Sequence, residues 1–190
     1  MTAKLFDPTP TTGNPAHSLE SQQLAILLGG LGWVGRDLCR TVQQRALLIS
    51  HAARTKDIAT KHTALWVHTG ITTLQLSREQ SFFGADDARP DGQRSHSAAP
   101  IPPVDLVRIG RLTLTTPERT ALDLMATDIE TGMGAALALI RSGVSLHALR
   151  SRADALRRIT GMKRVRQVLA QIPDSIVEDL TKGAYAPLAG

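Results

Sequence analysis

The sequence predicts an α+β protein that is mostly helical and carries a small antiparallel sheet. Only 3% of the residues are aromatic, whereas 42% are hydrophobic, so the core must be built from Leu, Ile, Val and Ala. Such a core favours packed helices over an aromatic-rich sheet. Helix start and stop signals frame several apolar stretches. Strand-like alternation of apolar and polar residues is confined to the middle of the chain.

A chain of 190 residues fits one domain of ordinary size with one core. Its first residues are rich in Thr, Pro, Gly and Asn, which is typical of a mobile arm. The predicted organisation is a flexible arm over 1–17, a single globular domain over 18–180 and a tail over 181–190. Within the domain we expect helices over 18–70, a hairpin or sheet over 71–116 with an exposed loop at 77–103, and helices over 117–180.

Three helices are expected in the first half of the chain. The first begins at Ser18 and runs through Leu28, where the glycine-rich stretch 29–32 breaks it. A longer helix is expected from Trp33 to about Arg54, because its apolar residues recur at helical spacing. A third is expected over about 60–68, with Gly70 as its C-terminal glycine.

The character of the sequence changes after Gly70. Residues 71–76 alternate like a strand, and the loop that follows combines proline, serine, aspartate and glycine without a sustained period. Residues 104–109 and 111–115 alternate again around Gly110, which predicts a β-hairpin. Leu106, Leu112 and Leu114 would share its packed side only if a bulge at Gly110 corrects the register.

Four helices are expected after the hairpin. The first begins with Thr116 as N-cap, Pro117 at the first helical position and an acid in the first turn. The second covers about 131–141 and ends at Gly143. Ser145 caps the third, expected over 146–159, and Thr160-Gly161 separates it from the fourth, expected over 162–172.

Positive charge gathers in the last third of the chain. The net charge is +5 and the sequence pI is near 10, which bears on partners and solubility and not on fold. Residues 141–170 contain eight arginines and lysines against one acid, Asp154. Arginine dominates, and its planar guanidinium suits bidentate contact with phosphate or carboxylate. The segment therefore predicts an anionic partner.

The start of the last helix is the most informative part of this segment. Lys163, Arg164 and Arg166 lie near its first turn, where the helix dipole opposes cations by about 0.3–1 kcal/mol each at low salt. An anion bound to these cations and to free backbone amides would offset that cost. The predicted nucleic-acid- or anion-binding residues are Arg150, Arg157, Arg158, Lys163, Arg164 and Arg166.

A solvated helical face is the alternative explanation of this charge. Asp154 can pair with Arg158 at i,i+4, and long arginine stems can cover the edge of the core. A helix-turn-helix is not predicted, because Arg157 and Gln167 stand where that motif needs a small and an apolar residue. The few aromatics also argue against a stacking platform for single strands.

No pattern of catalytic or metal-binding residues is apparent. Cys39 is the single cysteine, so there can be no intramolecular disulfide and no cysteine-based zinc site, and a reducing compartment is indicated. The histidines lack metal-ligand spacing, and no phosphate-binding loop or nucleophile elbow occurs. The glycines of 29–35 are interpreted as helix breakers. We expect no enzyme, no catalytic residue, no metal and no cofactor.

Three stretches together resemble one family. They are Thr63-Ala64-Leu65-Trp66-Val67-His68-Thr69-Gly70, then Leu112-Thr113-Leu114-Thr115-Thr116-Pro117-Glu118-Arg119-Thr120-Ala121-Leu122-Asp123-Leu124, and Gly161-Met162-Lys163-Arg164-Val165-Arg166. In this order they resemble the C-terminal module of AbiEi-type antitoxins and regulators, over roughly residues 58–180. Arg-Thr-x-Leu-Asp-Leu is the most specific match. The winged-helix head of that family is not evident in 1–57, and its nuclease-like extension is expected to be absent.

The resemblance and the basic helices together predict a non-enzymatic, antitoxin-like regulator that binds DNA through a basic helical face. The alternative is a protein-interaction module in which the same arginines meet an acidic toxin or another protein, without nucleic acid. A remnant with only a scaffold role is a third possibility. No signal peptide or membrane span is recognised, so a soluble, cytoplasmic protein without membrane contact is expected.

Overall fold

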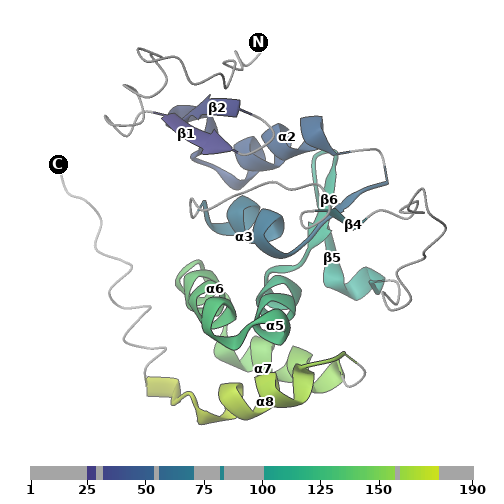
Figure 1. The fold of residues 1–190 in the computed structure, drawn as a ribbon, viewed down its shortest axis with the longest axis vertical. Coiled ribbons are helices and arrows are strands. Elements are labelled where there is room, and N and C mark those ends of the chain that lie inside the picture. Colours follow the sequence, from purple (N-terminus) through teal and green to yellow (C-terminus); the bar gives the residue numbers. More distant parts are fainter. Residues whose placement is uncertain are drawn as a thin grey trace. The chain divides into compact units, whose positions relative to one another are not determined.

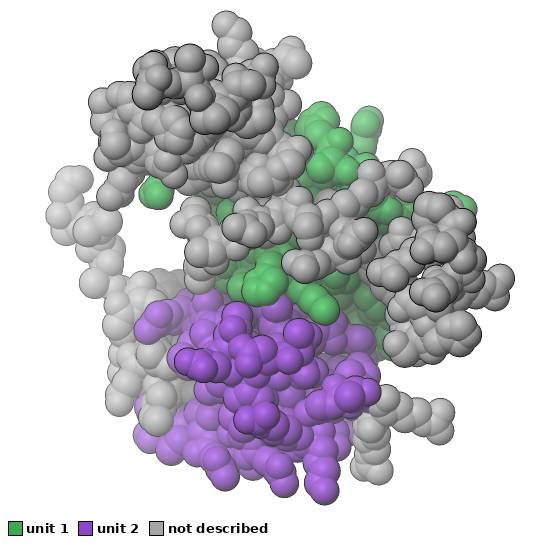
Figure 2. All heavy atoms as spheres, in the orientation of Figure 1, with its two compact units in different colours: residues 1–115 green, residues 116–190 purple. Residues whose placement is uncertain are grey.

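The computed structural model describes residues 25–28, 32–53, 56–70, 82–83, 101–156 and 159–175. The chain forms two compact units, residues 1–115 and 116–190, which Figure 2 colours separately. The boundary between these units lies within the range 18–180, over which a single domain is predicted. No linker marks this boundary in the sequence, because the hairpin leads directly into the next helix. The predicted fold class, α+β and mostly helical, is confirmed.

The first unit begins with a two-stranded antiparallel sheet where helices were expected (Figure 1). Strands β1 (Ala25–Leu28) and β2 (Gly32–Gly35) pair in register, with Leu28 opposite Gly32. A short apolar run such as 25–28 fits a strand as well as a helix, and pairing with a neighbour decides between them. Two of the glycines that were interpreted as helix breakers, Gly32 and Gly35, therefore lie in a strand.

Two helices follow in this unit. After the 3₁₀ turn η1 (Arg36–Cys39), helix α2 covers Val42–Ala52, so the helix expected from Trp33 begins nine residues later. Thr41 and Gln44 form a capping box at its start: the Gln44 amide donates to Thr41 Oγ1 at 3.2 Å, and the Thr41 amide donates to Gln44 Oε1 at 3.0 Å. Helix α3 (Lys61–Thr69) ends as predicted at Gly70, whose φ is 75°.

A four-stranded sheet with the order β4-β3-β6-β5 completes the unit. Its strands are β3 (Ile58–Ala59), β4 (Phe82–Phe83), β5 (Leu106–Ile109) and β6 (Leu112–Thr115), and η2 (Pro103–Asp105) precedes β5. The β3–β6 pair is parallel and the other pairs are antiparallel, so the sheet is mixed. The strand expected over 71–76 lies outside the described residues.

The hairpin β5–β6 forms as predicted, but without a bulge. Ile109 lies opposite Leu112 and Val107 lies opposite Leu114, so these four side chains share the packed side of the sheet. Leu106 lies opposite Thr115 instead. Because the hairpin has no bulge at Gly110, β5 contributes Val107 and Ile109 to the packed side, and not Leu106.

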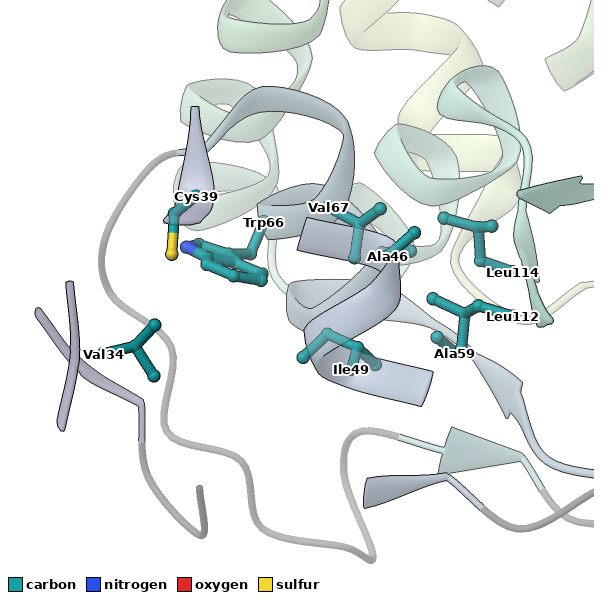
Figure 3. Close-up of a cluster of buried hydrophobic side chains, with 10 residues drawn as sticks. Val34, Cys39, Ala46, Ile49, Ala59, Trp66, Val67, Leu112 and Leu114 are labelled. Atoms are coloured by element: carbon teal, nitrogen blue, oxygen red, sulfur yellow. The ribbon is translucent and has the colours of Figure 1, made fainter. Parts of the chain in front are cut away.

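The core of the first unit forms where α2, α3 and the sheet meet (Figure 3). Ile49 of α2, Trp66 of α3 and Leu114 of β6 are each no more than 1% exposed. Trp66, one of the two tryptophans of the chain, is thus a core residue. The side chain of the other, Trp33, lies outside the described residues.

A buried arginine fastens α3 to the end of η1. The Arg45 guanidinium donates to four backbone carbonyls, those of Val67 (2.8 Å), Cys39 (2.8 Å), Arg40 (3.0 Å) and His68 (3.2 Å). Burial lowers the pKa of Arg45, but an arginine remains charged. The carbonyls at the C-terminus of α3 supply the negative end of the helix dipole to this cation.

The second unit is helical in its described part. Its helices are α5 (Pro117–Thr127), α6 (Ile129–Arg141), α7 (Leu146–Ala155) and α8 (Met162–Gln171). Thr116 and Ser145 cap α5 and α7 as predicted, and Asp128 caps α6. Helix α5 packs against the other three (Figure 1). The expected helix over 146–159 is correct at its start and ends four residues early, at Ala155.

Among the described residues, the longest helix is α6, with 13 residues, and no helix combines the length and apolar character that a membrane span requires.

Candidate nucleic-acid interface

Helices α7 and α8 pack against each other, and each buries a stripe of apolar side chains. Leu146, Leu149, Ala153 and Leu156 are buried on α7, each at most 7% exposed. Met162, Val165 and Leu169 are buried on α8. The basic side chains of both helices therefore lie on or beside the surface. Contacts of Arg150 with Leu169 and of Arg166 with Ala153 give the pair an antiparallel register.

The start of α8 is set by a glycine that cannot be replaced by a capping side chain. Gly161 has a φ of 84°, and a Cβ built there would lie 2.6 Å from the carbonyl oxygen of Ala126 on α5. Glycine alone combines this backbone conformation with so close an approach. Helix α8 therefore begins without a side-chain cap.

Most backbone amides in the first turn of α8 are nevertheless engaged. The amides of Arg164 and Val165 donate to the Gly161 carbonyl at 3.0 and 3.2 Å, and the Met162 amide donates to Ile159 at 3.2 Å. In the described part of the chain, the Lys163 amide is the one of this turn without a hydrogen bond. The expected cradle of several free amides is therefore reduced to one amide and the side chains around it.

Lys163 and Arg164 are exposed on this first turn. Both stand at the positive end of the helix dipole, where a cation is locally unfavourable. Arg164 also lies near Asp128, the N-cap of α6. Hydrogen bonds from Thr131 are the main cause that lowers the pKa of the Asp128 carboxyl, and the positive charge of Arg164 lowers it further. The Asp128 carboxylate thus places a weak opposite charge in the neighbourhood of Arg164.

Arg150 has a different position from the one predicted for a phosphate ligand. Its Nε donates to the Leu169 carbonyl at 3.1 Å, and its two terminal nitrogens donate to the Ile172 carbonyl at 2.5 Å and to the Asp174 carboxylate at 2.8 Å. The guanidinium is therefore committed to the C-terminal end of α8. Arg166 is also partly committed, because its Nη1 donates to the Ala153 carbonyl at 3.1 Å.

Arg157 and Arg158 lie outside the described residues, and so does the Asp154–Arg158 pair of the alternative explanation. The structure thus places the Arg150 guanidinium at the C-terminal end of α8 and that of Arg166 at the C-terminal end of α7. It leaves Lys163 and Arg164 exposed. Sequence reasoning missed Asp128 as a neighbour of this surface. No local signal could have found it, because Asp128 and Arg164 come close only when α6 and α8 are both placed against α5.

Cys39, in the first unit, is held in an unreactive state. Burial raises the pKa of the Cys39 thiol to about 11; the charge of Arg45 lowers it in part, and Asp37 raises it. A thiol that stays protonated at neutral pH is a poor nucleophile. Nowhere in the ranges that the structure describes do three His, Cys, Asp or Glu side chains gather as metal ligands would.

Comparison of the chain with family models, with curated proteins and with solved structures finds no match. The resemblance to AbiEi-type regulators therefore stays a prediction.

Proposed function

We propose that the second unit binds the phosphate backbone of duplex DNA through the start of α8, as a non-enzymatic, antitoxin-like regulator in the cytoplasm. The observation that carries this proposal is the exposure of Lys163 and Arg164 on the uncapped first turn of α8. Two cations at a site where the helix dipole disfavours them are best accounted for by an anion that offsets the cost. Arg166 is half-buried beside them and has a second terminal nitrogen for such a contact.

Binding of this kind is driven by counterion release. Each phosphate contact contributes about −0.9 to the slope of log K against log salt. Lys163 and Arg164 therefore give a slope of about −2, and Arg166 would bring it to about −3. So few contacts support affinity in the non-specific range, with a Kd of about 10⁻⁴–10⁻⁶ M at physiological salt. Contacts to phosphate alone would carry no sequence information.

Fluorescence anisotropy on a labelled duplex at two salt concentrations tests the proposal. The double variant Lys163→Gln/Arg164→Gln should lose most of the affinity and most of the salt dependence. The matched control is Arg111→Gln/Arg141→Gln, which removes the same charge from two exposed positions on a turn and on α6. Undetectable binding of the wild type at low salt would sink the proposal, and so would equal losses in the two double variants.

A protein partner is the second candidate, favoured by the mixed charge around Arg164. The Asp128 carboxylate beside it weakens the attraction for a polyanion, whereas alternating charges suit a protein surface that carries both signs. A toxin-like partner that co-purifies in stoichiometric amount, and that the Lys163→Gln/Arg164→Gln variant releases, would favour this function. Copurification unaffected by that variant would count against it.

A further inference from the structure

Arg150 and Arg166 form reciprocal caps between α7 and α8. Arg150, on α7, donates to the carbonyls of Leu169 and Ile172 at the C-terminal end of α8. Arg166, on α8, donates to the carbonyl of Ala153, one of the last four of α7. Each helix thus supplies the cation that satisfies the C-terminal carbonyls of the other. The last four carbonyls of a helix lack partners within the helix, so these bonds fill a structural need.

The electrostatic situation of these two arginines is opposite to that of Lys163 and Arg164. A cation at a helix C-terminus is stabilised by the dipole, whereas one at the N-terminus is destabilised. Arg150 and Arg166 are therefore explained by the fold itself and need no external anion. Lys163 and Arg164 remain unexplained by any contact within the described residues except the nearby charge of Asp128. The six predicted cations consequently do not form one equivalent set.

We infer that Arg150 and Arg166 are positioning residues, which fix α8 against α7 and thereby fix where Lys163 and Arg164 project. This inference rests on the proposed function, because it assigns roles within the same surface. The Arg150 guanidinium spans three acceptors, the carbonyls of Leu169 and Ile172 and the Asp174 carboxylate, which lie in the last turn of α8 and just beyond it. A lysine ammonium is a compact charge on a flexible stem and cannot reproduce this planar fork.

The test exploits that difference between arginine and lysine. A phosphate contact mostly survives the change from arginine to lysine, because the charge is kept, whereas the cap on several carbonyls does not. Arg150→Lys in the full chain should raise hydrogen-exchange rates in the last turn of α8 by about tenfold. It should also weaken duplex binding several-fold while leaving the salt slope unchanged. Arg141→Lys, at an exposed position on α6, is the matched control, and it should leave both the exchange rates and the affinity close to those of the wild type.

Other outcomes would contradict either the cap between the helices or the positioning role of Arg150. Unchanged exchange in Arg150→Lys would overturn the cap itself. Faster exchange with unchanged DNA affinity would overturn the positioning role. If Arg150→Gln made the slope of log K against log salt less negative by about 0.9, Arg150 would be a phosphate contact and not a positioning residue. If the wild type does not bind DNA, the positioning role falls with the proposed function, and faster exchange in Arg150→Lys would still distinguish that case from failure of the cap.

Discussion

Helix α6 approaches the backbone of α5 closely at Gly132. A Cβ built there would stand 2.3 Å from both the amide nitrogen and the Cα of Met125, and 2.7 Å from the carbonyl carbon of Leu124. All three atoms belong to the backbone of α5, so no side chain can rotate away. Carbon atoms in contact normally lie about 3.5–4.0 Å apart. Gly132→Ala therefore requires α5 and α6 to separate by about 1 Å or more.

The size of the effect follows from two opposing contributions. Overpacking of a close-packed interior typically costs about 1–3 kcal/mol, and a clash with backbone belongs at or beyond the upper end of this range. Alanine is favoured over glycine in a helix by about 1 kcal/mol, which offsets part of this cost. We expect Gly132→Ala to lower the free energy of unfolding of the helical unit by about 2 kcal/mol or more.

Gly134, one half-turn along the same helix, is the matched control. It is exposed, and a Cβ there would meet nothing within 4 Å. Gly134→Ala should therefore stabilise the unit by about 1 kcal/mol. The two variants differ only in where the methyl group points, so their difference of about 3 kcal/mol isolates the helix contact.

Hydrogen exchange of peptides from α5 and α6, measured at increasing urea concentration, gives these free energies for the helical unit specifically. The slowest amides of both helices should exchange faster in Gly132→Ala and slower in Gly134→Ala. A Gly132→Ala protein as stable as the wild type would refute the close approach of α6 to α5. An equal loss of stability in both variants would show that the effect does not depend on where the added methyl group points, and would refute a specific clash with α5.

Two further predictions concern the first unit. Arg45→Met removes the donor to four carbonyls and should destabilise this unit by about 3 kcal/mol in urea titrations followed by tryptophan fluorescence, whereas Arg36→Met, at an exposed position, should not. Cys39 has a pKa raised from 9.0 to about 11. In the unfolded protein the thiol therefore ionises at a lower pH than in the folded protein. The free energy of unfolding should fall by about 2–3 kcal/mol as pH rises from 9 to 11. Cys39→Ala should lack that part of the fall, and equal pH profiles would contradict the burial of the thiol.

Sequence patterns located the helices of the second unit because their signals are local. Thr116 and Ser145 each accept a hydrogen bond from the amide three residues ahead, as their types and positions indicate. The glycine ends at Gly70 and Gly143, both with positive φ, are local signals too. The hairpin over 25–35 was missed because its stability depends on pairing between strands, which an apolar run does not reveal.

The basic surface was predicted only in part, for a related reason. Amino-acid type and helical spacing placed Lys163 and Arg164 on an exposed turn. They could not show that Arg150 reaches the end of another helix, since that contact depends on the antiparallel register of α7 and α8. The burial of Arg119, which forms an ion pair with Asp123 at 2.8 Å, likewise depends on packing that residue type and spacing do not show. The most specific stretch of the family resemblance is thus largely interior in this structure.

Gly161 restricts how this protein could be engineered. A common way to stabilise a helix is to install Ser, Thr, Asp or Asn at its N-cap, and α2, α5, α6 and α7 already carry such residues. Helix α8 cannot follow them, because any side chain at Gly161 would collide with the Ala126 carbonyl and strain the backbone. No capping side chain can therefore be installed at the start of α8, so the Lys163 amide stays available to solvent or to a ligand.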